Sequence, residues 1–126
     1  MGLVFDTGGL IAFECGDREV AALVEAARRR RDMVVTSSGC VAQAWRGGGS
    51  RQAHLARLLR GLSEVGLDHR VSRATGELCG RTTTSDVVDA HLALLSRDDD
   101  LVLTSDVDDL RLLLRSRGVS ARVQRC

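Results

Sequence analysis

The sequence contains no lysine, and this absence excludes several kinds of phosphate chemistry. All 18 basic residues of the 126 are arginine. A nucleotide-binding phosphate loop needs the Lys of its GxxxxGK[ST] motif, so none is expected. A receiver-like phosphoacceptor domain, which also places acids at strand ends, would need a Lys beside them. The Thr-Gly-Gly segment after Asp6 is too short for a GxGxxG dinucleotide-binding motif.

Long apolar runs, cysteine pairs and proline are also absent. No segment approaches the roughly 20 apolar residues that span a bilayer, and the N-terminal residues lack the basic start and apolar centre of a signal peptide. We therefore expect a cytoplasmic protein without membrane contact. The four cysteines form no CxxC pair, and the three histidines show no cysteine at zinc-binding spacing. Neither disulfides nor a zinc site are expected.

Length and patterning predict a single domain over residues 1–126. The composition, 44% hydrophobic and 28% charged, is that of an ordinary globular protein. Short apolar runs at 2–5, 33–36 and 101–104 predict buried strands, and residues 20–27 show the i, i+3, i+4, i+7 spacing of an amphipathic helix. Apolar strands that alternate with helices favour a three-layer α/β/α fold with a central, mainly parallel sheet.

Local signals predict several turns and helix ends. Residues 7–9 are expected to form a turn after the first strand, and Ser85 is expected to cap a helix. That helix, at 87–95, is apolar around nearly its whole circumference, which predicts burial. His91 within it is expected to be hydrogen-bonded and partly buried. Gly118 is expected to end the last helix.

Aspartates stand where α/β proteins form their sites. Asp6 and Asp106 each follow an apolar strand, and ligands in such sheets bind beyond the carboxyl ends of the strands. Asp86 and Asp89 share one face of the buried helix. Capping explains Asp86, but a buried Asp89 carboxylate needs a partner or a metal ion. If these acids converge, Mg²⁺ or Mn²⁺ would relieve their repulsion, because both ions prefer oxygen ligands.

The formal net charge of +1 conceals an uneven distribution of charge. From Asp86 to Asp109 there are eight acidic residues and one arginine, whereas from Arg28 to Arg81 there are eleven arginines and four acidic residues. An acidic centre bordered by arginine suits a metal site that meets the phosphates of a nucleic acid.

Three segments together resemble the PIN-domain family, and among its members the VapC-type toxins of bacterial toxin–antitoxin pairs. The segments are LVFDTGGLIA at 3–12, SDVVDAHLALL at 85–95 and LVLTSDVDDL at 101–110. They are similar to the family's first strand and turn, to its helix that begins with Asp, and to its late strand that ends in Thr-x-Asp. Their order and separation fit the family, and the resemblance covers essentially the whole chain.

The resemblance implies a metal-dependent endoribonuclease. Asp6, Asp89 and Asp106 would be catalytic and would bind Mg²⁺ or Mn²⁺ together with Asp86; which of Asp86 and Asp89 is the principal ligand stays open. Asp108 and Asp109 are interpreted as helix N-terminal charges, one of which could assist through water. Polar residues of the same motifs are expected to support the site: Thr7, Gln43, Thr104 and Ser105.

The same resemblance implies how the protein acts and what it binds. Water would hydrolyse an RNA phosphodiester, leaving a 3′-hydroxyl and a 5′-phosphate. The chain would form a homodimer, and a small cognate antitoxin protein would cover the site. One residue departs from the family pattern: Gln43 stands on the helix after the second strand, where a Glu is usual. The alternative is therefore a PIN-like module that binds RNA or a partner without cutting.

Overall fold

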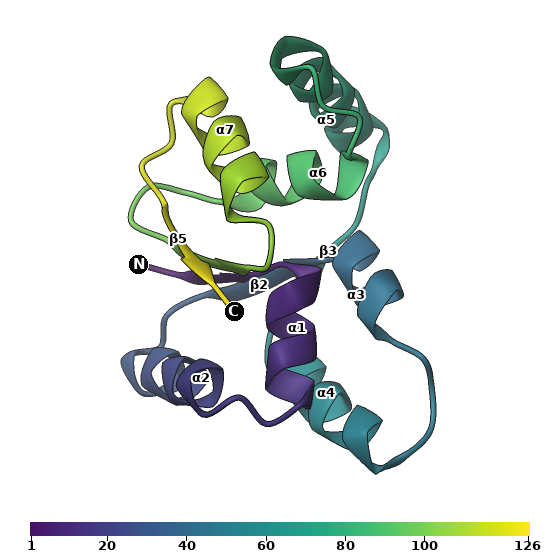
Figure 1. Cartoon of the computed structure of the whole chain (residues 1–126), viewed down its shortest axis with the longest axis vertical. Helices are drawn as coiled ribbons and strands as arrows, with labels where there is room; N and C mark the ends of the chain where they lie inside the picture. The colour runs from purple at the N-terminus through teal and green to yellow at the C-terminus, as the bar shows by residue number, and fades with distance from the viewer.

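The computed structural model describes residues 1–126, and its centre is a five-stranded parallel sheet (Figure 1). The strand order is β3-β2-β1-β4-β5, and all four pairings are parallel. The strands are β1 (Leu3–Phe5), β2 (Val34–Ser37), β3 (Ser63–Val65), β4 (Leu101–Thr104) and β5 (Arg122–Arg125). The predicted three-layer fold around a mainly parallel sheet is confirmed.

Seven helices cover the two faces of the sheet. Figure 1 shows α5, α6 and α7 on one face and α1, α2 and α4 on the other, with α3 beside α1. None of them is long and apolar enough to cross a membrane. Their bounds are α1 (Thr7–Glu14), α2 (Arg18–Arg30), α3 (Ser38–Ala44), α4 (Ser50–Arg60), α5 (His69–Thr82), α6 (Val87–Leu95) and α7 (Val107–Arg117).

The core lies on both sides of β1 and β4, which are buried at every position. A parallel sheet with helices on both faces hides its strands from water, which explains why these strands are wholly apolar except for their final Thr104. The α6 helix is also buried, as its apolar circumference predicts. The prediction that His91 is hydrogen-bonded was wrong, because its buried Nε2 atom has no partner.

The turn predicted after β1 was wrong, because α1 begins at Thr7. Gly8 and Gly9 form the first turn of this helix. A Cβ atom at Gly8 would lie 2.8 Å from the backbone nitrogen of Ser105, and one at Gly9 would lie 3.0 Å from the Cβ of Leu103. The two glycines thus allow α1 to pack closely against the end of β4.

The chain has no proline to mark helix ends, and an aspartate and a glycine bound α6 and α7 instead. The predicted cap at Ser85 was wrong by one residue, because Asp86 is the N-cap of α6 and its Oδ1 accepts a hydrogen bond from the backbone N–H of Asp89 at 3.0 Å. Gly118 ends α7 as predicted, in a left-handed conformation with φ of 69° that favours glycine.

Candidate metal centre

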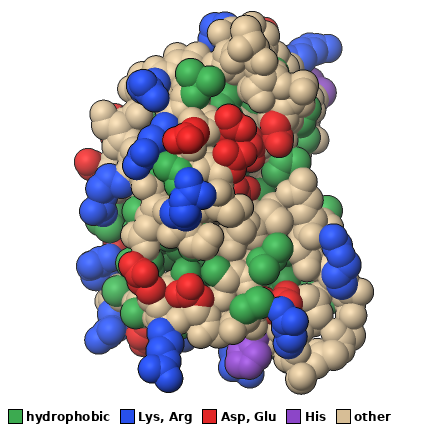
Figure 2. All heavy atoms as spheres, viewed as in Figure 1, with side chains coloured by type: hydrophobic (Ala, Val, Ile, Leu, Met, Phe, Trp, Pro, Cys, Tyr) green, Lys and Arg blue, Asp and Glu red, His purple; other side chains and the backbone are tan.

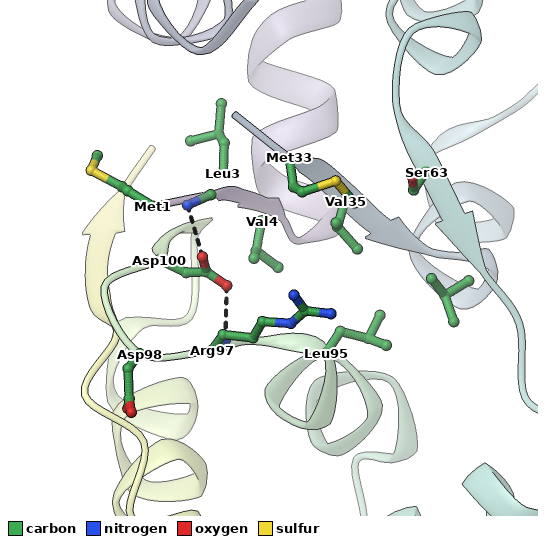
Figure 3. Close-up of a pocket in the computed structure, with 12 residues that line it drawn as sticks. Met1, Leu3, Val4, Met33, Val35, Ser63, Leu95, Arg97, Asp98 and Asp100 are labelled. Atoms are coloured by element: carbon green, nitrogen blue, oxygen red, sulfur yellow. Dashed lines mark hydrogen bonds between the residues drawn. The ribbon is translucent and has the colours of Figure 1, made fainter. Parts of the chain in front are cut away.

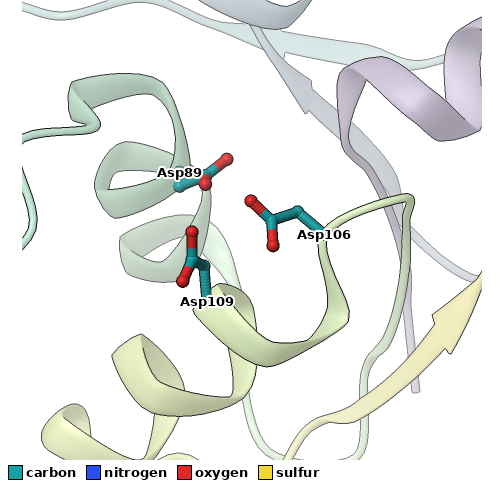
Figure 4. Close-up of side chains that lie close together, drawn as sticks. All are labelled: Asp89, Asp106 and Asp109. Atoms are coloured by element: carbon teal, nitrogen blue, oxygen red, sulfur yellow. The ribbon is translucent and has the colours of Figure 1, made fainter.

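Three carboxylates meet beyond the carboxyl end of β4 (Figure 4). Asp89, Asp106 and Asp109 each offer one carboxylate oxygen, and these three atoms lie within 4.8 Å of one another. Asp89 comes from the first turn of α6, Asp106 lies two residues after the end of β4, and Asp109 comes from the first turn of α7. The packing of α6 against α7 therefore assembles the group, which we call the three-acid group.

Asp89 is the buried member of the three-acid group. Its residue is 6% exposed, and its Oδ2 atom has no hydrogen-bond partner. Burial, followed by repulsion from Asp6, raises the pKa of Asp89 to about 7, and the charges of Asp86, Asp106 and Asp109 act in the same direction. A buried oxygen without a donor, surrounded by like charges, is an arrangement that a cation would stabilise.

Asp106 occupies a capping position without capping. It is the N-cap residue of α7, yet its side chain makes no hydrogen bond to the helix, whereas an N-cap Asp usually accepts one from the first turn. The side chain meets Asp109 instead, and the hydrogen bond and repulsion between these two carboxyl groups raise the pKa of Asp109. The carboxyl group of Asp106 is thus directed at acidic neighbours.

Asp6 lies outside the three-acid group but beside it, because its charge contributes to the raised pKa of Asp89. It is 5% exposed. Its Oδ1 accepts hydrogen bonds from the backbone N–H of Thr7 at 2.8 Å and from the thiol of Cys40 at 3.5 Å, and its Oδ2 accepts one from the hydroxyl of Thr104 at 2.5 Å. These donors fix the carboxylate and leave lone pairs free, since a carboxylate has about four acceptor sites.

Thr104 and Gln43 support Asp6 in different ways. The Thr104 hydroxyl also accepts a hydrogen bond from the backbone N–H of Asp106 at 2.9 Å, so it links two acids that follow different strands. Gln43 reaches the site through Thr7, whose hydroxyl donates to the Gln43 Oε1 at 2.5 Å. Gln43 therefore lies next to the acids but adds no charge.

The structure brings some of the predicted site residues together and leaves others outside the three-acid group. Asp89 and Asp106 come together in the three-acid group, and Asp86 stands apart as a cap whose charge still raises the pKa of Asp89. Asp109 was interpreted only as a helix N-terminal charge or a helper through water. Its i, i+3 spacing from Asp106 was the available signal, because residues so spaced share a helix face.

The donor set fits a hard cation. The three-acid group and Asp6 offer carboxylate oxygens alone, and such oxygens are the ligands that Mg²⁺ and Mn²⁺ prefer. The sulfur that contacts Asp6, that of Cys40, is buried, and burial raises the pKa of this thiol. A protonated thiol that donates to Asp6 is a poor metal ligand, because metals bind the thiolate.

Two members of the three-acid group, Asp106 and Asp109, are exposed at the surface. Figure 2 shows a patch of acidic side chains on one face, with many basic side chains along its left-hand edge. A hollow of about 400 Å³ lies at the opposite ends of the strands, where Met1, Met33 and Leu95 line it (Figure 3). There Asp100 accepts hydrogen bonds from the backbone N–H groups of Gly2 and Arg97.

Comparison with known proteins establishes the fold. No protein-family model and no curated protein matches the sequence. A chain in the crystal structure of VapBC2 from Rickettsia felis, bound to a DNA fragment from their promoter, is similar with a TM-score of 0.70 and 12% identity, over 98% of this chain and 99% of that chain. A chain in the structure of FitAB bound to the IR36 DNA fragment is similar with a TM-score of 0.63 and 15% identity, over 96% of this chain and 94% of that chain.

Proposed function

We propose that the chain is a Mg²⁺- or Mn²⁺-dependent endoribonuclease and the toxin of a toxin–antitoxin pair. The observation that carries this proposal is the three-acid group beside Asp6, beyond the carboxyl ends of β1 and β4. The pairing with an antitoxin is supported by the structural neighbours, because VapBC2 and FitAB are toxin–antitoxin complexes. The resemblance of the three motifs to VapC-type toxins agrees with both parts.

The proposed ligands are Asp6, Asp89 and Asp106, with Asp109 completing the group and Asp86 adding charge from its capping position. A bound ion would supply Lewis-acid activation of water and would offset the negative charge that develops on the phosphate. The residues of the chain orient these ligands. The Thr104 hydroxyl and the Thr7 backbone hold Asp6, and Asp106 keeps its carboxyl group free of the helix that it begins.

The proposed partners follow from the same surface. RNA is the proposed substrate, and a homodimer is the proposed assembly. The cognate antitoxin is proposed to cover the three-acid group and Asp6. An antitoxin arginine directed at the three-acid group would match its charge and geometry, since guanidinium and carboxylate form paired hydrogen bonds. Such a contact would take the place of the cation.

Gln43 favours the second candidate function, a module that binds RNA or a partner without cutting. Its side chain is neutral, and its carbonyl oxygen already accepts the hydroxyl hydrogen of Thr7. The enzyme is preferred because the three-acid group is complete without Gln43.

The deciding experiment is RNA cleavage by purified protein with Mn²⁺. Three proteins are compared: the wild type, Asp106→Asn, and Asp99→Asn as a control of equal charge change. Asp99 is exposed in a loop before β4 and has φ of 68°, a conformation that Asn tolerates. The proposal expects cleavage by the wild type and the control and little by Asp106→Asn. Equal cleavage by all three would indicate a contaminant, and RNA binding without cleavage would favour the second candidate.

A further inference from the structure

We propose that Arg125 binds a phosphate of the RNA backbone beside the acidic centre, by which we mean the three-acid group together with Asp6. This inference rests on the proposed ribonuclease function, because it assigns a second substrate contact to the same site. It begins with the register of the sheet, in which Arg125 on β5 is paired with Thr104 on β4. Paired residues of neighbouring strands share a face, so the Arg125 side chain leaves the sheet on the side of the Thr104 hydroxyl, which holds Asp6.

The guanidinium of Arg125 crosses from β5 to the end of β4. Its Nη1 donates a hydrogen bond to the backbone carbonyl of Ser105 at 2.8 Å. Ser105 directly precedes Asp106, a member of the three-acid group. This hydrogen bond therefore places a positive charge at the rim of the acidic centre.

Arg125 keeps most of its binding capacity. The chain forms three ion pairs, and none of them includes Arg125. A guanidinium has five N–H donors, and the bond to Ser105 uses one. A guanidinium near several acids would be expected to pair with one of them. Arg125 instead rests on a neutral carbonyl, which orients it and leaves its charge available.

Phosphate is the ligand that this arrangement suits. A guanidinium binds phosphate through two parallel N–H···O bonds, which fixes direction as well as distance. The three-acid group and Asp6 repel every phosphate of an RNA strand that no cation separates from them. An arginine anchored at the rim offsets this repulsion for a phosphate that neighbours the scissile one, and so sets where the strand lies.

The test measures binding of a short, fluorescein-labelled single-stranded RNA by fluorescence anisotropy. Proteins carry Asp106→Asn, so that the RNA stays intact, and differ further by Arg125→Ala, Arg125→Lys or Arg122→Ala. Arg122 is the matched control: it is exposed, lies at the other end of β5, and its side chain makes a single hydrogen bond, to the sulfur of Met1 at 3.5 Å. Thermal unfolding of each variant, and the Mn²⁺-induced shift of Arg125→Ala in an otherwise wild-type chain, verify that fold and metal binding are intact.

Arg125→Ala is expected to weaken RNA binding by about tenfold, the effect of losing one charge-assisted contact. The slope of log affinity against log salt should become shallower by about 0.7, as for one lost phosphate contact on a single strand. Arg125→Lys should lose less, and Arg122→Ala should match the parent. Equal affinities for Arg125→Ala and Arg122→Ala would overturn the role of Arg125, and cleavage by the wild type would then leave the proposed function standing. No binding by the parent and no cleavage by the wild type would overturn both.

Discussion

The hydroxyl of Thr104 donates a hydrogen bond to the carboxylate of Asp6 at 2.5 Å, joining two residues that are 98 positions apart in the sequence. Both residues are buried. The same hydroxyl accepts the backbone N–H of Asp106, so one oxygen atom holds the ends of β1 and β4 and the start of α7 together. The acidic centre therefore depends on a neutral side chain as much as on its carboxylates.

Replacing this hydroxyl should destabilise the fold. Thr104→Val preserves the shape of the side chain but leaves a buried carboxylate oxygen and the Asp106 N–H without a partner, which should cost about 1–3 kcal/mol of unfolding free energy. Thr104→Ser keeps the hydroxyl and is the matched control. Urea unfolding measures both variants. Equal stability of the Val and Ser variants would show that the two hydrogen bonds contribute nothing.

The titration of Asp89 should make the metal-free protein less stable as the pH rises from about 4 to about 7. The pKa of Asp89 is about 7 in the folded chain, against an ordinary value of 3.8. Between these values the folded state keeps a proton that the unfolded state releases, so a rise in pH favours unfolding, and this contribution levels off above pH 7. Asp89→Asn should flatten this part of the profile. Denaturant unfolding in EDTA across this range measures the free energy of unfolding against pH. An unchanged slope in Asp89→Asn would refute a raised pKa of Asp89.

Manganese should raise the melting temperature of the wild type. An ion that binds only the folded state stabilises it by about 2.7 kcal/mol when its concentration is a hundred times the Kd. Asp106→Asn and Asp109→Asn each remove a member of the three-acid group and should reduce the shift, whereas Asp99→Asn should keep it. A wild type that does not respond to millimolar Mn²⁺ would count against a metal centre.

Gln43→Glu should strengthen metal binding. The new carboxylate can still accept the Thr7 hydroxyl, and it adds a charge next to Asp6. The Mn²⁺-induced rise in melting temperature should increase, and the stability in EDTA should fall because one more like charge joins the acids. Ala42→Glu adds the same charge at an exposed position of α3 and is the control. Equal responses of the two variants would place Gln43 outside the metal centre.

The sequence predicted the architecture because the strands are short, apolar and separated by helical periodicity. Residues 101–104 illustrate this, since predicted and observed strands coincide. Gly8 and Gly9 show where local reading fails. Two adjacent glycines favour a turn by their own conformational freedom, but here they lie in a helix, and glycine is needed because the end of β4 leaves no room for a Cβ atom. No local signal carries information about a strand that lies so far along the chain.

Part of the candidate site was also predictable from the sequence, because some of its residues follow the predicted strands. Asp6 and Asp106 stand at strand ends, a position that topology alone makes informative. Asp109 was missed as a member because a negative charge in the first turn of a helix has a sufficient local explanation in the helix dipole. Its second role exists only through the packing of α7 against α6, which brings Asp89 to it.

The place of β1 between β2 and β4 also determines when the acidic centre can exist during protein synthesis. Asp6 leaves the ribosome about a hundred residues before its partner Thr104 and the neighbouring Asp106. Contacts so distant in sequence form late in folding, because the intervening chain must first be closed into a loop. A nascent chain that has not yet reached β4 therefore carries the first acid without the site. If the protein cuts RNA, it cannot cut the message from which it is being translated until β4 and Asp106 have been made.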